Sequence, residues 1–279
     1  MTTLSESFSA MSAHRTRFFA AFVSLSAVLT TPLAAQSSLQ GYGPVSARYR
    51  MLITGQSSQI MMGETQVSDS KSDQVATVVI SKVGNVLTQV MTLDSVAVSN
   101  TSPVPAPDVS TAIGMKLTGT MDLDGKIATS AVTDKMGTTS TSPFATNMRS
   151  FLPRLKLGAT SGTSWVDSAT SVTKQNGADV TTKTVTTYTL AGDTTVAGAR
   201  AWKIASMSTG KVTGSGNQQG ADFTMGGSVT GHGTFVISLA GVFFGADLVS
   251  DVNMIVEVPM ASMTIPITQK QTTRIRMLP

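Results

Sequence analysis

Four two-residue turn signals separate long runs of β-forming residues, and they constrain the fold more than any other feature. They are Gly84-Asn85, Asp124-Gly125, Asn176-Gly177 and Ala240-Gly241. Glycine and asparagine accept the positive φ angles of tight hairpins, so each signal predicts two antiparallel strands joined directly. Helical periodicity is scarce outside one short stretch. The sequence therefore predicts an all-β fold of antiparallel sheets.

That stretch, residues 142–162, divides the β-forming runs into two halves. Pro143 suits the first position of a helix, and Pro153 should end it. Because proline cannot donate to a β-ladder, the stretch must lie outside the sheets. We expect a short helix at this connector, between a first β half at 36–141 and a second at 163–279.

The apolar residues of the connector predict how it packs. Phe144, Met148 and Leu152 recur at helical spacing, so this face should bury against a sheet. Trp165 opens the first strand of the second half and should be largely buried. Both halves repeat a similar order of strands and turns, which suggests an internal repeat. We expect the two similar halves to form a curved half-barrel or a sandwich-like arrangement.

Three local features carry further expectations. Residues 36–45, with two glycines and a proline, should form a loose leader. The glycine-rich segment 214–220 should be a flexible loop. Pro266 lies within an alternating run, so it should mark an edge position of a sheet.

The connector also carries a motif, Leu152-Pro153, then a basic and apolar stretch, Gly158 and Ser164-Trp165. Between two β-rich halves, this order resembles an uncharacterised class of secreted bacterial β-rich proteins. That class has a Leu-Pro…Gly…Trp connector between two similar halves. The resemblance implies export and a two-half β architecture, and it supplies no catalytic residues.

The N-terminus has the pattern of a secretory signal peptide. Arg15 and Arg17 precede an apolar run at 18–28, and small residues follow at 33–35. The run is too short for a membrane-spanning helix. Aromatic residues, 5% of the chain, are too few for the girdles of a membrane-spanning sheet. We expect residues 1–35 to be removed and the mature protein, not membrane-spanning, to be periplasmic or extracellular.

Composition excludes several chemistries. The chain has no cysteine, so it has no thiol nucleophile, disulfide or thiolate metal site. A net charge of +4 with few aromatic residues does not indicate a nucleic-acid partner. His232, the single histidine after the signal segment, lies between two glycines, where a surface position is expected rather than a triad base. The sequence predicts no catalytic residue, no cofactor and no metal site.

Methionine is the unusual residue of this chain, with 16 copies. Most of them fall on alternating strand positions, where flexible thioethers either fill a core or line an adaptable apolar cavity. The candidates for cavity lining are Met51, Met91, Met121, Met254 and Val256.

Two functions fit these features. The first is a non-enzymatic periplasmic or secreted protein that binds or carries an apolar ligand, such as a lipid-like small molecule. The second is a structural or interaction protein of the cell envelope, whose threonine-rich sheet face contacts an envelope protein. An apolar pocket of several hundred Å³ would favour the first function. A packed interior with a flat exposed patch would favour the second.

Overall fold

The computed structural model describes residues 37–61, 63–101, 109–140, 142–175, 178–218 and 220–279. The predicted signal peptide and the predicted Asn176-Gly177 turn lie outside the described residues. The chain divides into two units, Met1–Gln36 and Ser37–Pro279, and all of the described residues belong to the second. None of the helices in the described ranges has the length and apolar character needed to cross a membrane.

The second unit forms one antiparallel sheet of 11 strands. The first half holds β1 (Val45–Met61), β2 (Glu64–Val83), β3 (Val86–Asn100), β4 (Lys116–Asp122) and β5 (Ile127–Thr133). Helix α1 (Pro143–Arg149) follows. The second half holds β6 (Ser164–Gln175), β7 (Ala178–Val196), β8 (Ala199–Gln218), β9 (Ala221–Ser238), β10 (Phe243–Val258), the 3₁₀ helix η1 (Pro259–Ala261) and β11 (Met263–Met277).

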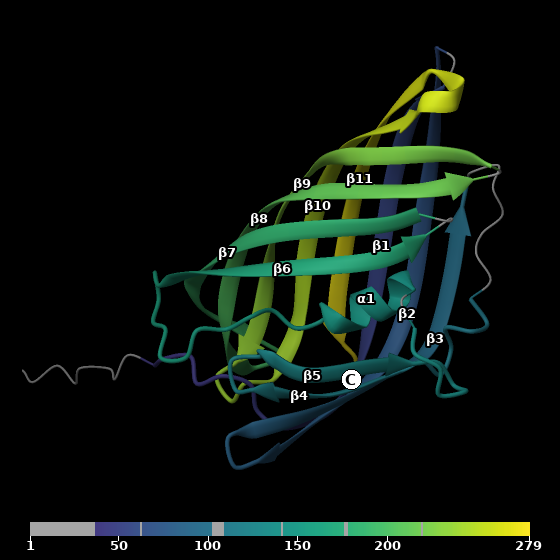
Figure 1. Cartoon of the computed structure of the whole chain (residues 1–279). Helices are drawn as coiled ribbons and strands as arrows, with labels where there is room; N and C mark the ends of the chain where they lie inside the picture. The colour runs from purple at the N-terminus through teal and green to yellow at the C-terminus, as the bar shows by residue number, and fades with distance from the viewer. Residues whose placement is uncertain (1–36, 62, 102–108, 141, 176–177, 219) are drawn as a thin grey trace, which may run out of the picture. The chain divides into compact units, whose positions relative to one another are not determined.

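The two halves join through β1 and β11, so they share a single sheet. These strands pair from Tyr49–Met277 to Gln59–Ile267. The strand order is β5-β4-β3-β2-β1-β11-β10-β9-β8-β7-β6, which leaves β5 and β6 as the two unpaired edges. The sheet curls around α1, which lies between β5 and β6 (Figure 1) and contacts both strands. The predicted all-β half-barrel with a helix at the connector is confirmed.

The core lies at one end of the concave face, under the connector. Phe151 meets Tyr49 and Phe243 edge-on, with ring centroids 5.2 and 5.3 Å apart. The Tyr49 hydroxyl donates a hydrogen bond of 2.7 Å to the Phe243 carbonyl oxygen. We call this region, where the connector covers the sheet, the packed end.

The connector packs through the face that its spacing predicts. Met148 is buried, and Phe144 and Leu152 are partly buried against the core. The Ser142 hydroxyl caps α1 by accepting a hydrogen bond from the Ala145 amide, as its position before Pro143 suggests. Trp165 is buried in β6, and its indole N–H donates to the carbonyl oxygen of Arg154 at 2.9 Å.

The segment before β1 is not loose, contrary to expectation. Leu39 and Tyr42 are almost fully buried. The Leu39 amide donates to the Ala159 carbonyl oxygen at 2.8 Å, and the Tyr42 hydroxyl donates to the Pro153 carbonyl oxygen at 2.7 Å. Two apolar side chains and their hydrogen bonds therefore outweigh the flexibility of the neighbouring glycines.

Two other local expectations also change in the structure. The predicted loop at 214–220 is strand as far as Gln218, because β8 and β9 stay paired up to Gln218–Ala221. Pro266 lies in a central strand rather than an edge strand. However, the β1 ladder runs only to Ile267, so Pro266 has a paired strand on one side alone. That local edge accommodates the missing N–H.

Candidate functional site

Five strands place a line of small polar residues across the concave face. Thr186 of β7 pairs with Ser208 of β8, and Ser208 pairs with Gly231 of β9. Ser250 of β10 pairs with Gly231 and with Gln271 of β11. Residues directly opposite in antiparallel strands point to the same face. We call these five residues the hydroxyl row.

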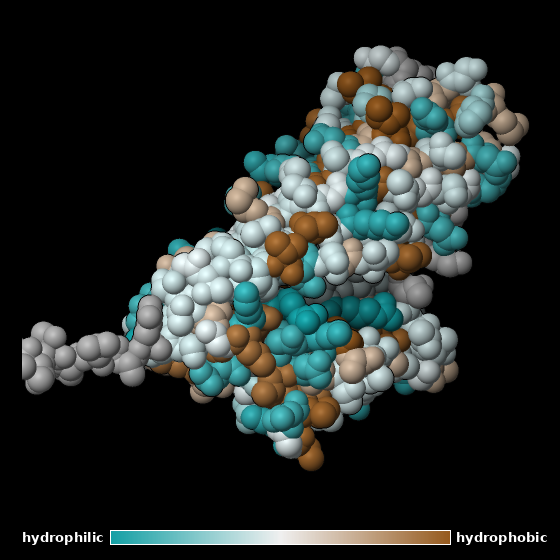
Figure 2. Space-filling model, turned by 60° about the vertical axis from the view of Figure 1, so that its left-hand side comes forward, coloured by the Kyte–Doolittle hydropathy of each residue, from teal (hydrophilic) through white to brown (hydrophobic). Residues whose placement is uncertain are grey.

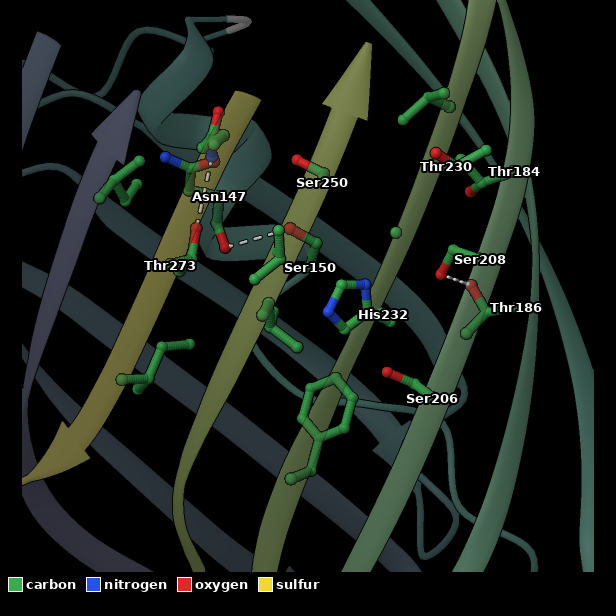
Figure 3. A pocket seen from close by; sticks show the side chains of 18 of the residues that line it. Asn147, Ser150, Thr184, Thr186, Ser206, Ser208, Thr230, His232, Ser250 and Thr273 are labelled. Carbon is green, nitrogen blue, oxygen red and sulfur yellow. Dashed lines mark hydrogen bonds between the residues drawn. The ribbon is translucent and has the colours of Figure 1, made fainter. Parts of the chain in front are cut away.

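A cavity of about 360 Å³ lies over the hydroxyl row, and we call it the row cavity. The connector contributes Asn147 and Ser150 to its lining, and β8 contributes Ser206 beside Ser208 (Figure 3). The hydroxyls of Thr186 and Ser208 are hydrogen-bonded at 2.9 Å. The lining is thus rich in uncharged hydroxyl and amide groups.

Several hydroxyls of the row cavity are free to bind. Within the described parts of the chain, the side chains of Thr184, Ser206 and Ser250 have no hydrogen-bond partner, although all three line the cavity. Ser206 is only 7% exposed. A hydroxyl offers one donor and two acceptor positions, so these groups can serve a polar ligand.

Beyond the hydroxyl row, the same strands enclose an apolar cavity of about 640 Å³, which we call the tip cavity. It lies toward the strand ends near η1, away from the connector. Twelve of its sixteen lining residues are apolar. They are Ala178, Val180, Val212, Ala221, Phe223, Met225, Val252, Met254, Val256, Val258, Ile265 and Ile267; the others are Gln59, Thr173, Thr182 and Gln269.

The two cavities adjoin on one continuous face. Val229 lines the row cavity and Val252 lines the tip cavity, and these two residues pair directly between β9 and β10. Moving along the strands from the packed end, the concave face is therefore aromatic, then hydroxylic, then aliphatic.

Charged residues avoid this face. Along residues 178–188, 206–216, 223–233, 248–258 and 263–273, every charged residue sits at a register position that faces outward. These outward residues are Asp179, Lys183, Lys211, Asp251, Glu257 and Lys270. The exception is at the edge of the sheet, where Asp167 of β6 lies opposite Thr186 and therefore faces inward. Burial raises the pKa of Tyr188, so its phenol stays neutral near the row.

Glycines shape the bend of these strands. At Gly227 an added β-carbon would lie 2.2 Å from the Asn253 carbonyl oxygen and 2.6 Å from Met254 Cα. At Gly231 the contact with the Val249 carbonyl oxygen would be 3.0 Å, and the next nearest atoms lie 3.7 Å or more away. Gly227 thus permits close approach of β9 and β10, whereas Gly231 leaves open space in the middle of the hydroxyl row.

His232 occupies an outward register position in the middle of β9, and it is also among the residues that line the row cavity (Figure 3). It pairs with Met207, which is 72% exposed, and it alternates with the inward-facing Gly231 and Gly233. Among the described residues, no group of three or more histidines, aspartates and glutamates is placed to hold a metal ion.

The structure separates the five residues predicted from the sequence to line a cavity. Met254 and Val256 line the tip cavity, and Met51 lines the row cavity. Met91 and Met121 are fully buried in the core instead. Alternation alone places all five inward and does not tell which part of the face is covered.

Sequence reasoning missed the hydroxyl row and most of the tip cavity. Ser208, Gly231 and Ser250 are far apart in sequence and form one line only when their strands pair. The information that reveals the hydroxyl row is therefore the register of neighbouring strands.

Side chains of intermediate polarity dominate the face shown in Figure 2. Most residues there have the pale colour of serine, threonine and glycine, and hydrophobic residues form small separate patches. Exposed apolar residues scattered singly are ordinary on protein surfaces.

Comparisons with protein-family models and with curated proteins found no match. Among solved structures, the chain is similar to OccK2 of Pseudomonas aeruginosa, with 8% identity, a TM-score of 0.26, and coverage of 86% of this chain and 100% of that chain. A DUF1329 family protein from Desulfovibrio piger gives 12% identity, a TM-score of 0.22, and coverage of 84% and 86%. A BenF-like porin from Pseudomonas fluorescens gives 8% identity, a TM-score of 0.25, and coverage of 85% and 100%. Because these TM-scores are low, we infer function from this chain's own residues.

Proposed function

We propose that this protein is a non-enzymatic protein of the bacterial envelope that binds or carries an apolar, lipid-like ligand on its concave face. The tip cavity carries this proposal. Its volume of about 640 Å³ lies within the range of ligand pockets, roughly 300–1,000 Å³. Its lining is mainly aliphatic, with a few amide and hydroxyl groups at the margin.

An apolar ligand should bind in the tip cavity because the apolar side chains there are only partly covered by the protein. Val252, Met254 and Val256 point inward from β10, yet each keeps an intermediate exposure. Apolar surface in water is unfavourable by roughly 25 cal/mol per Å², so an apolar ligand that covers it gains binding energy. Methionine side chains can adjust to chains of different shape.

Export supports the same proposal. The signal-peptide pattern at residues 1–35 sends the mature chain to the periplasm or the extracellular space. Lipids in either compartment need a protein surface if they are to leave a membrane, because water does not dissolve them. The second candidate function, contact with an envelope protein through the sheet, remains an outcome of the test.

The test is native mass spectrometry of the mature protein purified from its own cell envelope. We expect a non-covalent adduct of lipid size that is released when collision energy rises. Met254→Glu, which places a charge in the tip cavity, should remove the adduct. Ile255→Glu is the matched control, since Ile255 is the next residue of β10 and is 47% exposed on the opposite face.

Two results would count against ligand carriage. One is protein of unadducted mass from every preparation. The other is an adduct that survives Met254→Glu and disappears with Ile255→Glu, which would move the binding surface to the convex face. Copurification of a stoichiometric protein instead would favour the envelope interaction.

A further inference from the structure

We infer that the concave face selects an uncharged amphiphile with one apolar chain, whose polar head lies on the hydroxyl row and whose chain runs along β10 and β11 in the tip cavity. This inference rests on the proposed function and adds the chemical class of the ligand. It follows from the order of the bands along the strands, from the length of the apolar band, and from the position of the charges.

The order of the bands fixes the orientation of the ligand. Ser250 of the hydroxyl row lies two residues before Val252 on the same strand, and both point inward. An apolar chain placed in the tip cavity therefore has its nearer end beside Ser250. On the other side of the row lies the packed end, where Phe151 and Phe243 already fill the space. The row thus forms the inner boundary of the binding region.

The length of the apolar band suits one lipid chain. From Val252 to Val258 the strand makes six steps of about 3.3 Å, which is about 20 Å. One leaflet of a bilayer contributes about half of a hydrocarbon core that is about 30 Å thick. A single extended chain from a membrane lipid therefore fits between the hydroxyl row and the end of β10.

The row cavity offers room and partners for a polar head. Gly231 lacks a side chain, and the nearest side-chain atoms to an added β-carbon would be those of Ser250 at 3.7 Å and Ser208 at 3.8 Å. The hydroxyls of Ser206 and Ser250 have no partner among the described residues and can bond a head group. Hydroxyl, ester and amide groups match such donors and acceptors.

The outward placement of charge selects against an ionised head. Asp251 and Lys270 neighbour the row in sequence, yet both sit at outward positions of β10 and β11. Asp167 at the β6 edge is the one inward charge among the described residues of these rows, and it would repel an anion. A carboxylate or phosphate moved onto the row would lose water without gaining a countercharge, and an ammonium would gain only the carboxylate of Asp167 at the edge strand, so an ionised head costs free energy.

The experiment compares three probes with the same chain: monoolein, oleate and oleylamine. Each probe is titrated into the mature protein at neutral pH, at concentrations where few micelles form. The heat of binding is measured by calorimetry. We expect monoolein to bind at least about tenfold more tightly than either ionised probe. If oleate or oleylamine binds as tightly as monoolein, the inference is wrong while the proposed function stands. If none of the three binds, both fail.

Two substitutions test whether the polar head of the ligand binds on the hydroxyl row. Ser250→Ala removes a hydroxyl of the row and should weaken monoolein binding about fivefold, the value of one hydrogen bond. Ser228→Ala, on the exposed outward side of β9, is the control and should leave it unchanged. The affinity for oleate should stay the same in both variants. A loss of affinity with Ser228→Ala, or none with Ser250→Ala, would overturn the placement of the head on the row.

Discussion

The packed end and the tip of the half-barrel are built from the same strands, and they differ in what covers them. On β10, Phe243 and Ala246 are buried at the packed end, where Phe151 of the connector lies over the sheet. On the same strand, Met254 and Val256 face inward at the tip and remain partly exposed. Alternation selects the face, whereas the connector decides which part of the face becomes core and which part stays open to a ligand.

The largest effect should come from the packed end. Trp165→Ala removes a buried indole and its hydrogen bond to the Arg154 carbonyl oxygen, so it should lower the free energy of unfolding by about 3–5 kcal/mol. His232→Ala changes an exposed side chain in the middle of β9 and should cost less than about 0.5 kcal/mol. Thermal and denaturant melts of both variants measure the contrast.

A Trp165→Ala variant that melts like the wild type would mean that the connector does not hold the packed end together. A collapse of the fold in His232→Ala would mean that the convex face is not simply solvated surface.

Replacing one methionine in the core and one at the tip by alanine compares the packing of these two regions directly. Met91 is fully buried in the core, so Met91→Ala should cost about 2–5 kcal/mol. Met254 lines the open tip cavity, so Met254→Ala should cost less than about 1 kcal/mol in protein freed of ligand. Urea titrations give both values. Equal costs would show that the tip is packed like the core.

A second property of the packed end is its response to alkali. Burial raises the pKa of Tyr49 from 10.0 to about 12 and raises the pKa of Tyr42 well above 10.0. Folding therefore favours the neutral phenols, so stability should be complete below about pH 10 and should fall as the pH rises toward about 12. Tyr49→Phe should cost about 1 kcal/mol at neutral pH through the lost hydrogen bond to Phe243.

In alkali the wild type should lose stability that Tyr49→Phe keeps, because phenylalanine does not ionise. The gap between wild type and Tyr49→Phe should narrow above about pH 10 in urea titrations repeated across the range. A gap that stays constant would mean that Tyr49 ionises as freely in the folded as in the unfolded chain.

The helix cap at the start of the connector should contribute a small effect. Ser142 accepts a hydrogen bond from the Ala145 amide at 3.3 Å, so Ser142→Ala should lower the free energy of unfolding by about 1 kcal/mol. Ser142→Asp should restore most of the loss, since aspartate also caps helices well. If neither variant differs from the wild type, the cap contributes nothing to the cover of the packed end.

The sequence was sufficient for the fold class because its signals are local. The Gly84-Asn85 and Asp124-Gly125 turns join the β2–β3 and β4–β5 hairpins as expected, and Pro143 begins the helix. Local signals failed where tertiary contacts decide. Leu39 and Tyr42 turn an apparently loose leader into a part of the core.

The candidate site was only partly predictable for the same reason. Met254 and Val256 could be recognised as inward-facing from their own strand, and they do line the tip cavity. Met91 has the same local pattern but belongs to the core, where it is fully buried between its buried strand partners Val78 and Leu117. No pattern within one strand can show that Ser208 and Ser250 meet at Gly231.

The most direct measurement is photolabelling with a monoacylglycerol that carries a diazirine near the end of its chain, followed by peptide mass spectrometry. Labels should concentrate on Phe223, Met225 and Met254 of the tip cavity, and excess monoolein should suppress them. Met207 and Met260, which are 72% and 78% exposed outside the cavity, serve as internal controls and should stay unlabelled. Labels that favour Met207 and Met260, or that spread evenly over the protein, would contradict a ligand chain in the open end of the half-barrel.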